Sequence, residues 1–220
     1  MVKVLNTEKE DYHVHSLNFS DGMNTVDEVV KFAGEIGMKK IVFTDHSQAL
    51  LDANGLAKKG MRGVAKLWKN VHNDVEVIFG VEADLLNEKG DICAQIQGIQ
   101  GDFIILSFHK ESFSGDAKRL TEAYINAIKR HHEMIDCIGH LDVNCENVDV
   151  KKVVEAANEF DIPLELNCKC FSLGINDMKA LRIMLENAKS IYVNSDSHRL
   201  WDLKEFRKIG FKFLEENGFI

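Results

Sequence analysis

The sequence contains no run of apolar residues long enough for a membrane-spanning helix, which needs about 18 in succession. Residues 1–10 are polar and charged, and they lack the apolar segment of a signal peptide. Cysteine is scarce: the five thiols are odd in number and form no CxxC pair, and the one Cys168-Lys169-Cys170 motif is a weak metal signal. These absences argue against a membrane protein and a disulfide-stabilised secreted domain, and they favour a cytoplasmic protein with reduced thiols.

Interruptions of the chain are also few, because the 220 residues contain one proline, no Gly/Ser-rich linker and no internal repeat. With 45% hydrophobic and 28% charged side chains, the composition is that of a globular protein able to bury a sizeable core. We therefore predict a single domain over residues 1–220. The 27 basic residues are outnumbered by 35 acidic ones, and the formal charge of −8 argues against a broad surface for nucleic acid or an anionic membrane.

Short apolar runs alternate with longer segments of helical periodicity. The runs are rich in Val, Ile and Phe, which is typical of buried parallel strands. They are Tyr12–His15, Lys40–Thr44, Val75–Val81, Phe103–Phe108, Met134–Ile138, Ile162–Leu166 and Ser190–Val193. Helical periodicity follows Thr25, which forms a possible capping box with Glu28, and recurs in Leu56–Val71, Ala117–His131, Val150–Phe160, Met178–Ala188 and Leu203–Ile209; a short periodic segment, Ile92–Ile99, precedes the fourth strand.

This alternation predicts the fold class. Seven strands that alternate with helices indicate right-handed βα units and a parallel sheet. Seven units favour an α/β protein with a closed or nearly closed TIM-like barrel, one unit short of a (β/α)8 barrel. An open, doubly wound sheet is the alternative that periodicity leaves open.

Histidine is concentrated at the C-terminal ends of the predicted strands. Six of the nine histidines lie there, together with two acidic residues: His13, His15, His46, Glu82, His109, His140, Asp196 and His198. Active sites of α/β proteins are built at this edge, so we expect these side chains to meet in one site. Imidazole nitrogens combined with carboxylate oxygens suit zinc, iron or manganese better than calcium or magnesium.

Asp21 has two interpretations. It lies in Ser20-Asp21-Gly22, which is a turn signal. The local sequence favours a carboxylate that closes the loop before the helix at Thr25, and a further metal ligand is the alternative.

Seven short motifs resemble those of the PHP (polymerase and histidinol phosphatase) superfamily of metal-dependent phosphoesterases. In chain order they are residues 11–16 (DYHVHS), 20–22 (SDG), 44–47 (TDHS), 80–82 (GVE), 107–109 (SFH), 139–140 (GH) and 194–198 (NSDSH), which together span nearly the whole chain. The resemblance implies a distorted (β/α)7 barrel with the active site at the C-terminal ends of the strands, in agreement with the strand count.

The resemblance also implies a trinuclear metal centre with nine ligand residues. One ion would take His13, His15 and Asp196, with Glu82 bridging to a second ion on His109 and His140. The third ion would take Asp21, His46 and His198, so that Asp21 becomes an expected ligand, at a position where the family has histidine or an acid. The three ions would be divalent zinc, iron or manganese.

The chemistry of such a centre is phosphate-ester hydrolysis by water. Clustered divalent cations lower the pKa of a bridging water and neutralise phosphoryl charge, so a bridging hydroxide attacks without a side-chain nucleophile. We expect Glu82, Asp196 and His198 to act in catalysis. Lys110, Lys169 and Arg199 are candidates for phosphate binding. Asp11 and Asp45 are expected to orient neighbouring histidines or to close turns.

The leading hypothesis is hydrolysis of a small-molecule phosphomonoester, with histidinol phosphate the favourite. A phosphodiesterase or exonuclease of the same superfamily is the alternative, which the charge of −8 disfavours. A non-catalytic scaffold module is a third hypothesis. The presence of all nine candidate ligands argues against it, because such a module would be expected to lose ligands.

Overall fold

A parallel sheet forms the centre of the molecule. The computed structural model describes residues 1–56 and 61–220. The sheet has the order β1 (Lys3–Val4), β11 (Ser190–Asn194), β10 (Leu164–Asn167), β9 (Cys137–Ile138), β8 (Ile104–Ser107), β4 (Glu76–Leu85), β3 (Lys40–His46) and β2 (Glu10–Val14). All neighbours in this path are parallel, while β5 (Ile92–Cys93) adds antiparallel to β4, and β6 (Gln95–Ile96) pairs with β7 (Ile99–Gln100).

The sheet curls until its first and last long strands meet. A parallel bridge joins Val14 to Ser197, and the backbone N–H of His15 donates to the carbonyl oxygen of Ser197 at 2.9 Å. The seven predicted strands are confirmed as β2, β3, β4, β8, β9, β10 and β11, with ends that shift by a few residues. The prediction of a distorted seven-stranded α/β barrel is therefore confirmed, and the bridge closes it at the C-terminal ends of the strands.

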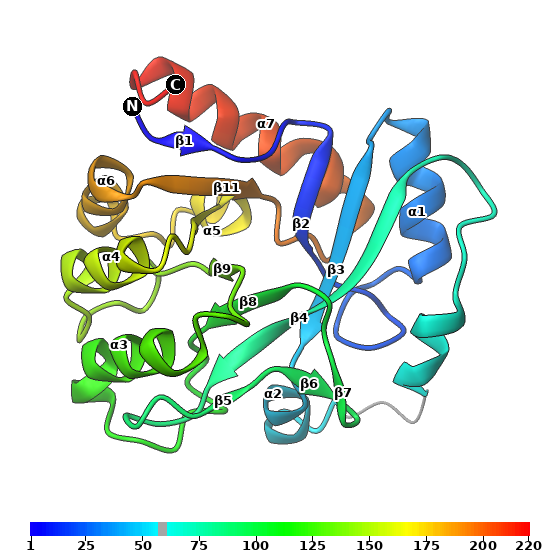
Figure 1. Cartoon of the computed structure of the whole chain (residues 1–220). Coiled ribbons are helices and arrows are strands. Elements are labelled where there is room, and N and C mark those ends of the chain that lie inside the picture. The colour runs from blue at the N-terminus through cyan, green and yellow to red at the C-terminus, as the bar shows by residue number, and fades with distance from the viewer. Residues whose placement is uncertain (57–60) are drawn as a thin grey trace.

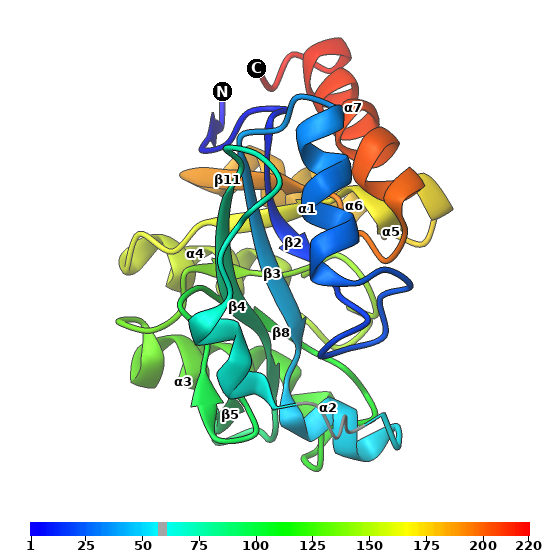
Figure 2. The ribbon, with the colours of Figure 1, turned by 90° about the vertical axis from the view of Figure 1, so that its right-hand side faces the viewer.

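Helices cover the outside of the curled sheet. They are α1 (Val26–Glu35), α2 (Gln48–Ala53), α3 (Leu120–His131), α4 (Val150–Glu159), α5 (Cys168–Leu173), α6 (Met178–Asn187) and α7 (Leu200–Glu216), with 3₁₀ turns η1 (Arg62–Leu67) and η2 (Ala117–Arg119). Helices α3, α4 and α6 stack along one side of the sheet (Figure 1). Helices α1 and α7 pack together on the other side, as Figure 2 shows.

Helix α1 begins where the sequence predicts. The Thr25 side chain accepts a hydrogen bond from the backbone N–H of Glu28, and the Glu28 carboxylate accepts one from the backbone N–H of Thr25 at 2.8 Å. This reciprocal capping box satisfies two N–H groups that the first turn leaves unpaired. The apolar face of the helix, which includes Val29, Val30 and Ala33, is buried against the sheet.

The predicted helix Leu56–Val71 is wrong. Residues 57–60 lie outside the described part of the chain, and the rest contains only the 3₁₀ turn η1. The physical reason is Arg62, whose side chain is almost fully buried and donates to the carbonyl oxygen of Gly80 at 2.7 Å. A buried guanidinium anchors this segment, while Leu67 and Val71, both 80% exposed, form no helical core face.

Other short elements also differ from the sequence prediction. The segment Ile92–Ile99, for which the periodicity predicts a helix, consists of the short strands β5 and β6 and the start of β7. The short elements β1, α2 and α5 were not predicted, and α7 extends well beyond Leu203–Ile209. Elements this short contain too few residues for a periodic pattern to identify them.

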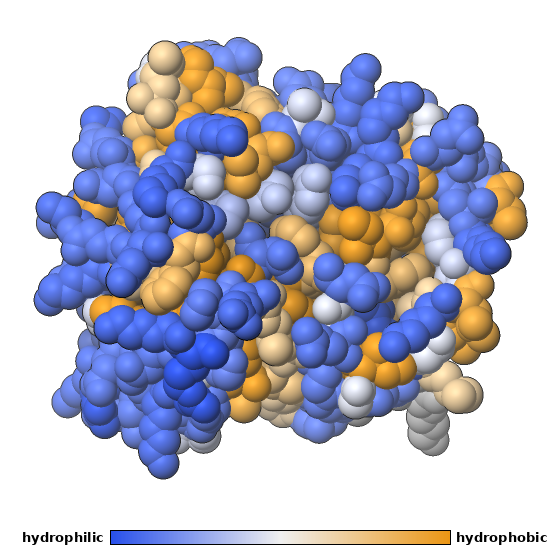
Figure 3. Space-filling view, viewed as in Figure 1, coloured by the Kyte–Doolittle hydropathy of each residue, from blue (hydrophilic) through white to orange (hydrophobic). Residues whose placement is uncertain are grey.

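Polar side chains cover much of one face of the molecule (Figure 3). On the face seen in Figure 3, hydrophilic side chains dominate and apolar ones form separate patches. Within the described residues, no helix is both long and apolar enough to cross a bilayer.

Candidate metal centre

The nine candidate ligands come together at the C-terminal edge of the sheet. His13 and His46 lie in the last two residues of β2 and β3, and His15 follows β2 directly. His109 and His140 each lie two residues beyond β8 and β9, and Asp196 and His198 follow β11. Asp21 reaches the same place from the loop between β2 and α1.

Glu82 lies at the centre of the group. It is in β4, directly opposite His46 in the β3–β4 register, and is 1% exposed. Its Oε2 atom lies 2.8 Å from His46 Nδ1, 3.5 Å from His13 Nε2 and 3.6 Å from His15 Nε2. Its Oε1 atom lies 2.8 Å from His140 Nε2 and 3.5 Å from His109 Nε2. One carboxylate thus faces five imidazoles, three with one oxygen and two with the other.

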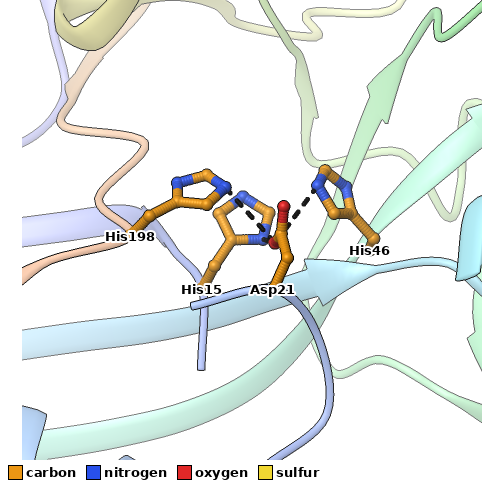
Figure 4. Close-up of side chains that lie close together, drawn as sticks. All are labelled: His15, Asp21, His46 and His198. Atoms are coloured by element: carbon orange, nitrogen blue, oxygen red, sulfur yellow. Dashed lines mark ion pairs between the residues drawn. The ribbon is translucent and has the colours of Figure 1, made fainter. Parts of the chain in front are cut away.

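Asp21 forms a second point of convergence. Its Oδ1 atom is 3.3 Å from His198 Nε2, 3.5 Å from His46 Nε2 and 3.8 Å from His15 Nδ1. In Figure 4 the carboxylate lies between the rings of His198 and His46, in front of His15. The Asp21 side chain is 34% exposed, so this part of the site is open to solvent.

Asp196 forms a third point of convergence of the candidate ligands. Its Oδ1 atom is 3.3 Å from His15 Nε2, 3.4 Å from His198 Nδ1 and 3.9 Å from His13 Nε2. The Lys169 ammonium lies 3.3 Å from the same oxygen. Asp196 (φ 51°) and His140 (φ 25°) both have left-handed backbone, a strained conformation for such residues that clusters at functional sites.

Among the described residues, three groups of side chains have donor atoms close enough to share a metal ion. They are His15, Asp21, His46 and His198; His13, His15 and Asp196; and His46, Glu82 and His109. The groups overlap at His15 and His46. This differs in detail from the sets implied by the family resemblance, because His46 joins Glu82 and His109, and His140 approaches through its contact with Glu82.

The close packing of carboxylates and imidazoles shifts the pKa values of the histidines in the site. Burial acts to lower the pKa of His13, but Glu165, Glu82 and Asp196 outweigh it and raise that pKa well above its usual value. Burial likewise opposes the raised pKa of His46, which Glu82 and Asp21 bring to about 10. Burial and the neighbouring His198 and His46 hold the pKa of His15 well below its usual value. The buried carboxylates therefore draw positive charge into the site.

Four buried atoms fit a bound cation. Within the described residues, Nε2 of His13, Nε2 of His15, Nδ1 of His46 and Oε2 of Glu82 make no hydrogen bond of acceptable geometry, although the last two lie 2.8 Å apart. An unpaired buried polar atom costs about 1–3 kcal/mol, so four in one place need a partner. Imidazole nitrogens and a carboxylate oxygen are the ligands that transition metals share, and the residues therefore fit a metal centre.

Comparison with known proteins decides the family. The family model of the PHP domain matches residues 11–166. The chain belongs to the PHP domain family. The match ends before Asp196 and His198, which the fold brings to the same site.

Relatives of this PHP protein cover almost its whole length. A protein of Thermoanaerobacter sp. named "probable phosphatase" is 30% identical over 217 residues, covering 94% of this chain and 86% of its own. A protein of the same name from Caldanaerobacter subterraneus is 30% identical over 214 residues, covering 94% and 82%.

Solved structures share the PHP fold. One is a Listeria monocytogenes protein described as a "putative histidinol phosphatase", with a TM-score of 0.60 and 15% identity over 91% of this chain and 99% of that one. Another is the histidinol phosphate phosphatase of Lactococcus lactis complexed with zinc, L-histidinol and phosphate, with a TM-score of 0.56 and 18% identity over 93% of both chains.

Two buried carboxylates of the PHP site were missed by the sequence reading. Glu165 Oε1 lies 2.8 Å from His13 Nδ1, and Asp84 Oδ1 lies 2.8 Å from His109 Nδ1. Both are fully buried. A signal was present for each, because Glu165 is a lone charge in a buried strand, and Asp84 follows Glu82 by two residues on the same strand face.

Asp11 and Asp45 hold backbone in place. Asp11 accepts from the N–H groups of His13 and Ser195 and pairs with Arg207 at 2.8 Å. Asp45 accepts from the N–H and hydroxyl of Ser16, and burial raises its pKa to about 6. We expected Asp11 and Asp45 either to orient neighbouring histidines or to close turns, and these contacts with backbone agree with the second role.

A cavity of about 650 Å³ opens beside the site. His109, His140 and Asp196 lie in its wall together with Lys110 and Lys169, two of the three cations predicted to bind phosphate. Arg199 is not among the residues that line it. The Arg199 guanidinium pairs with Asp202 at 2.8 Å, and the side chain is 55% exposed, so its predicted phosphate contact gains no support.

Proposed function

We propose that this PHP protein is a metal-dependent phosphatase that hydrolyses a small-molecule phosphomonoester. One observation carries the proposal: the nine candidate metal ligands converge on one site, three of them in the wall of a cavity, and four of their buried atoms make no hydrogen bond of acceptable geometry among the described residues. The names of the relatives, which are probable phosphatases, agree with it.

The proposed cofactor is a set of three divalent transition-metal ions, zinc, iron or manganese. His13, His15 and Asp196 would hold one, Glu82, His109 and His140 the second, and Asp21, His46 and His198 the third. Two of the groups in the structure support the first and third sets, and Glu82 with His109 supports the second, which His140 joins through its contact with Glu82.

When bound, such ions supply a nucleophile derived from water and neutralise phosphoryl charge. The side chains would hold the ions and bind the substrate. Glu82 joins the sets. Asp196 lies in the cavity wall, His198 Nδ1 lies 3.4 Å from its Oδ1 atom, and both are proposed as catalytic together with Glu82. Lys169 lies beside Asp196 in the cavity wall, where its ammonium would bind a phosphoryl oxygen, and Lys110 lines the same cavity.

The size of the cavity favours a small substrate. A volume of about 650 Å³ lies within the range of sites for small molecules, roughly 300–1,000 Å³. We propose histidinol phosphate as the first candidate, which is supported by the Lactococcus lactis structure with L-histidinol and phosphate. Residues 1–220 would act as one domain in the cytoplasm, where the five free cysteines stay reduced.

The test combines metal analysis with a substrate panel. Protein purified without chelator is analysed for metals and assayed with histidinol phosphate, other phosphomonoesters and a short single-stranded oligonucleotide. We expect about three ions per chain and turnover of a phosphomonoester. Preference for the oligonucleotide would instead indicate a phosphodiesterase, and a metal-free protein without turnover would overturn the proposal.

A further inference from the structure

Glu165 occupies an unusual position beneath the proposed metal centre. Its carboxylate is fully buried in β10 and has four hydrogen-bond donors around it. Oε1 accepts from His13 Nδ1 at 2.8 Å and from the Asn194 amide at 2.9 Å. Oε2 accepts from the backbone N–H of His140 and from the Asn167 amide, both at 3.1 Å. We propose that Glu165 is a positioning residue that organises two of the proposed metal sites at once.

The first site is organised through the His13 ring. A carboxylate can only accept hydrogen bonds, so the proton of a neutral His13 ring lies on Nδ1, toward Glu165. The lone pair then lies on Nε2, the atom that faces Glu82 and Asp196 at 3.5 and 3.9 Å. A partner of this kind fixes the tautomer and the orientation of a metal-binding histidine.

The second site is organised through the backbone of His140. The N–H that binds Glu165 Oε2 belongs to a residue with left-handed φ of 25°. Such a conformation persists only where its surroundings hold it. With the backbone held, His140 Nε2 lies 2.8 Å from Glu82 Oε1. The two oxygens of Glu165 thus reach ligands of two different sets.

Asp84 offers a contrast, because it serves one ligand ring. Its Oδ1 atom contacts His109 Nδ1 at 2.8 Å, and its Oδ2 atom accepts from the Ser47 hydroxyl at 2.6 Å. The set around Asp21 has a different arrangement, in which His198 Nδ1 lies 3.0 Å from the backbone oxygen of Asp196. Loss of Glu165 should therefore weaken two sites, and loss of Asp84 only one.

The experiment rests on the proposed function and compares three variants. Glu165→Gln, Asp84→Asn and the control Asp136→Asn are equilibrated with zinc at graded chelator strength and analysed for bound metal; Asp136 directly precedes β9, on the side away from the ligands. We expect Glu165→Gln to bind two ions roughly 10- to 100-fold more weakly and Asp84→Asn to weaken one, with the control unchanged. Equal losses in Glu165→Gln and the control would overturn the proposal.

A measurement on the wild-type protein covers the case in which Glu165→Gln does not fold. Long-range ¹H–¹⁵N spectra of ¹⁵N-histidine-labelled, zinc-loaded protein report which ring nitrogen carries the proton. We expect His13 to be protonated on Nδ1, and protonation on Nε2 would refute the role of Glu165. If the wild-type protein binds no ion at all, the proposed function fails instead, so the two failures are distinguishable.

Discussion

Replacement of Glu82 by glutamine tests the centre of the site most directly. The change preserves shape and removes the charge of a side chain that is 1% exposed and faces five imidazoles. One carboxylate oxygen becomes an amide nitrogen, which cannot bind a cation and which points hydrogens at ring nitrogens. Both the His46–Glu82–His109 group and the neighbouring His13 set lose negative charge.

The size of the effect follows from the number of groups affected. Loss of even an indirect partner of a metal ligand costs roughly 10- to 100-fold in affinity or activity. Glu82 would itself serve two of the proposed ions, those of the His13 and His109 sets, so the combined loss is on the order of 10²- to 10⁴-fold. We expect kcat/KM to fall about 10³-fold, which corresponds to about 4 kcal/mol of transition-state stabilisation.

The assay is hydrolysis of p-nitrophenyl phosphate, or of the best substrate from the panel, with metal content measured on the same samples. Glu76→Gln is the matched control, because Glu76 begins the same strand β4, is 60% exposed and pairs with Lys40 at 3.0 Å. The control should stay within about twofold of the wild-type kcat/KM, as expected for a surface ion pair. Near-normal turnover and metal content in Glu82→Gln would refute the assignment of this carboxylate to the ions.

Three further predictions concern the ions, the phosphate contact and the fold. Chelation should abolish turnover and lower the free energy of unfolding in denaturant, by about 2.7 kcal/mol for each site at which the free metal concentration had been 100 times the Kd. Readdition of zinc or manganese should restore both the turnover and the stability, and an unchanged unfolding curve would contradict this prediction. Lys169→Met should lower kcat/KM roughly 10- to 100-fold, the value of a hydrogen bond to a charged group, and more than Arg199→Met does, whereas the reverse order would favour Arg199 as the phosphate ligand. Thr25→Ala should cost about 1 kcal/mol of stability at unchanged kcat, because it removes only the cap of α1.

The pH dependence of the same cap provides a check on its charge. Hydrogen bonds from Thr25 lower the pKa of Glu28. A carboxylate with a lowered folded-state pKa stabilises the fold above its unfolded pKa, and it loses that contribution as the pH falls through the folded one. The stability difference between wild type and Glu28→Gln should therefore shrink in acid denaturation curves, and a difference that grows toward low pH would contradict the capping box.

Sequence order was enough to predict the edge where the site lies. Strands of a parallel sheet end on the same side. Residues that follow apolar runs, such as His46 and His140, can therefore be predicted to lie at one edge even though the distances between them are unknown. The same reasoning failed for Leu56–Val71, because the pattern cannot show that a buried guanidinium, that of Arg62, replaces a helix there. Glu165 was missed because its partners, His13 and His140, are distant in the sequence and depend on register.

The bridge between Val14 and Ser197 has a consequence for how the protein matures. It joins the beginning of the barrel to a segment near the end of the chain, so the seam can close only after residue 197 has left the ribosome. His13 and His15 on one side of the seam and Asp196 and His198 on the other have no common cation site before then. A bound ion would link the two sides of this seam. Metal binding would therefore be the last step of folding, and it would stabilise the closed barrel.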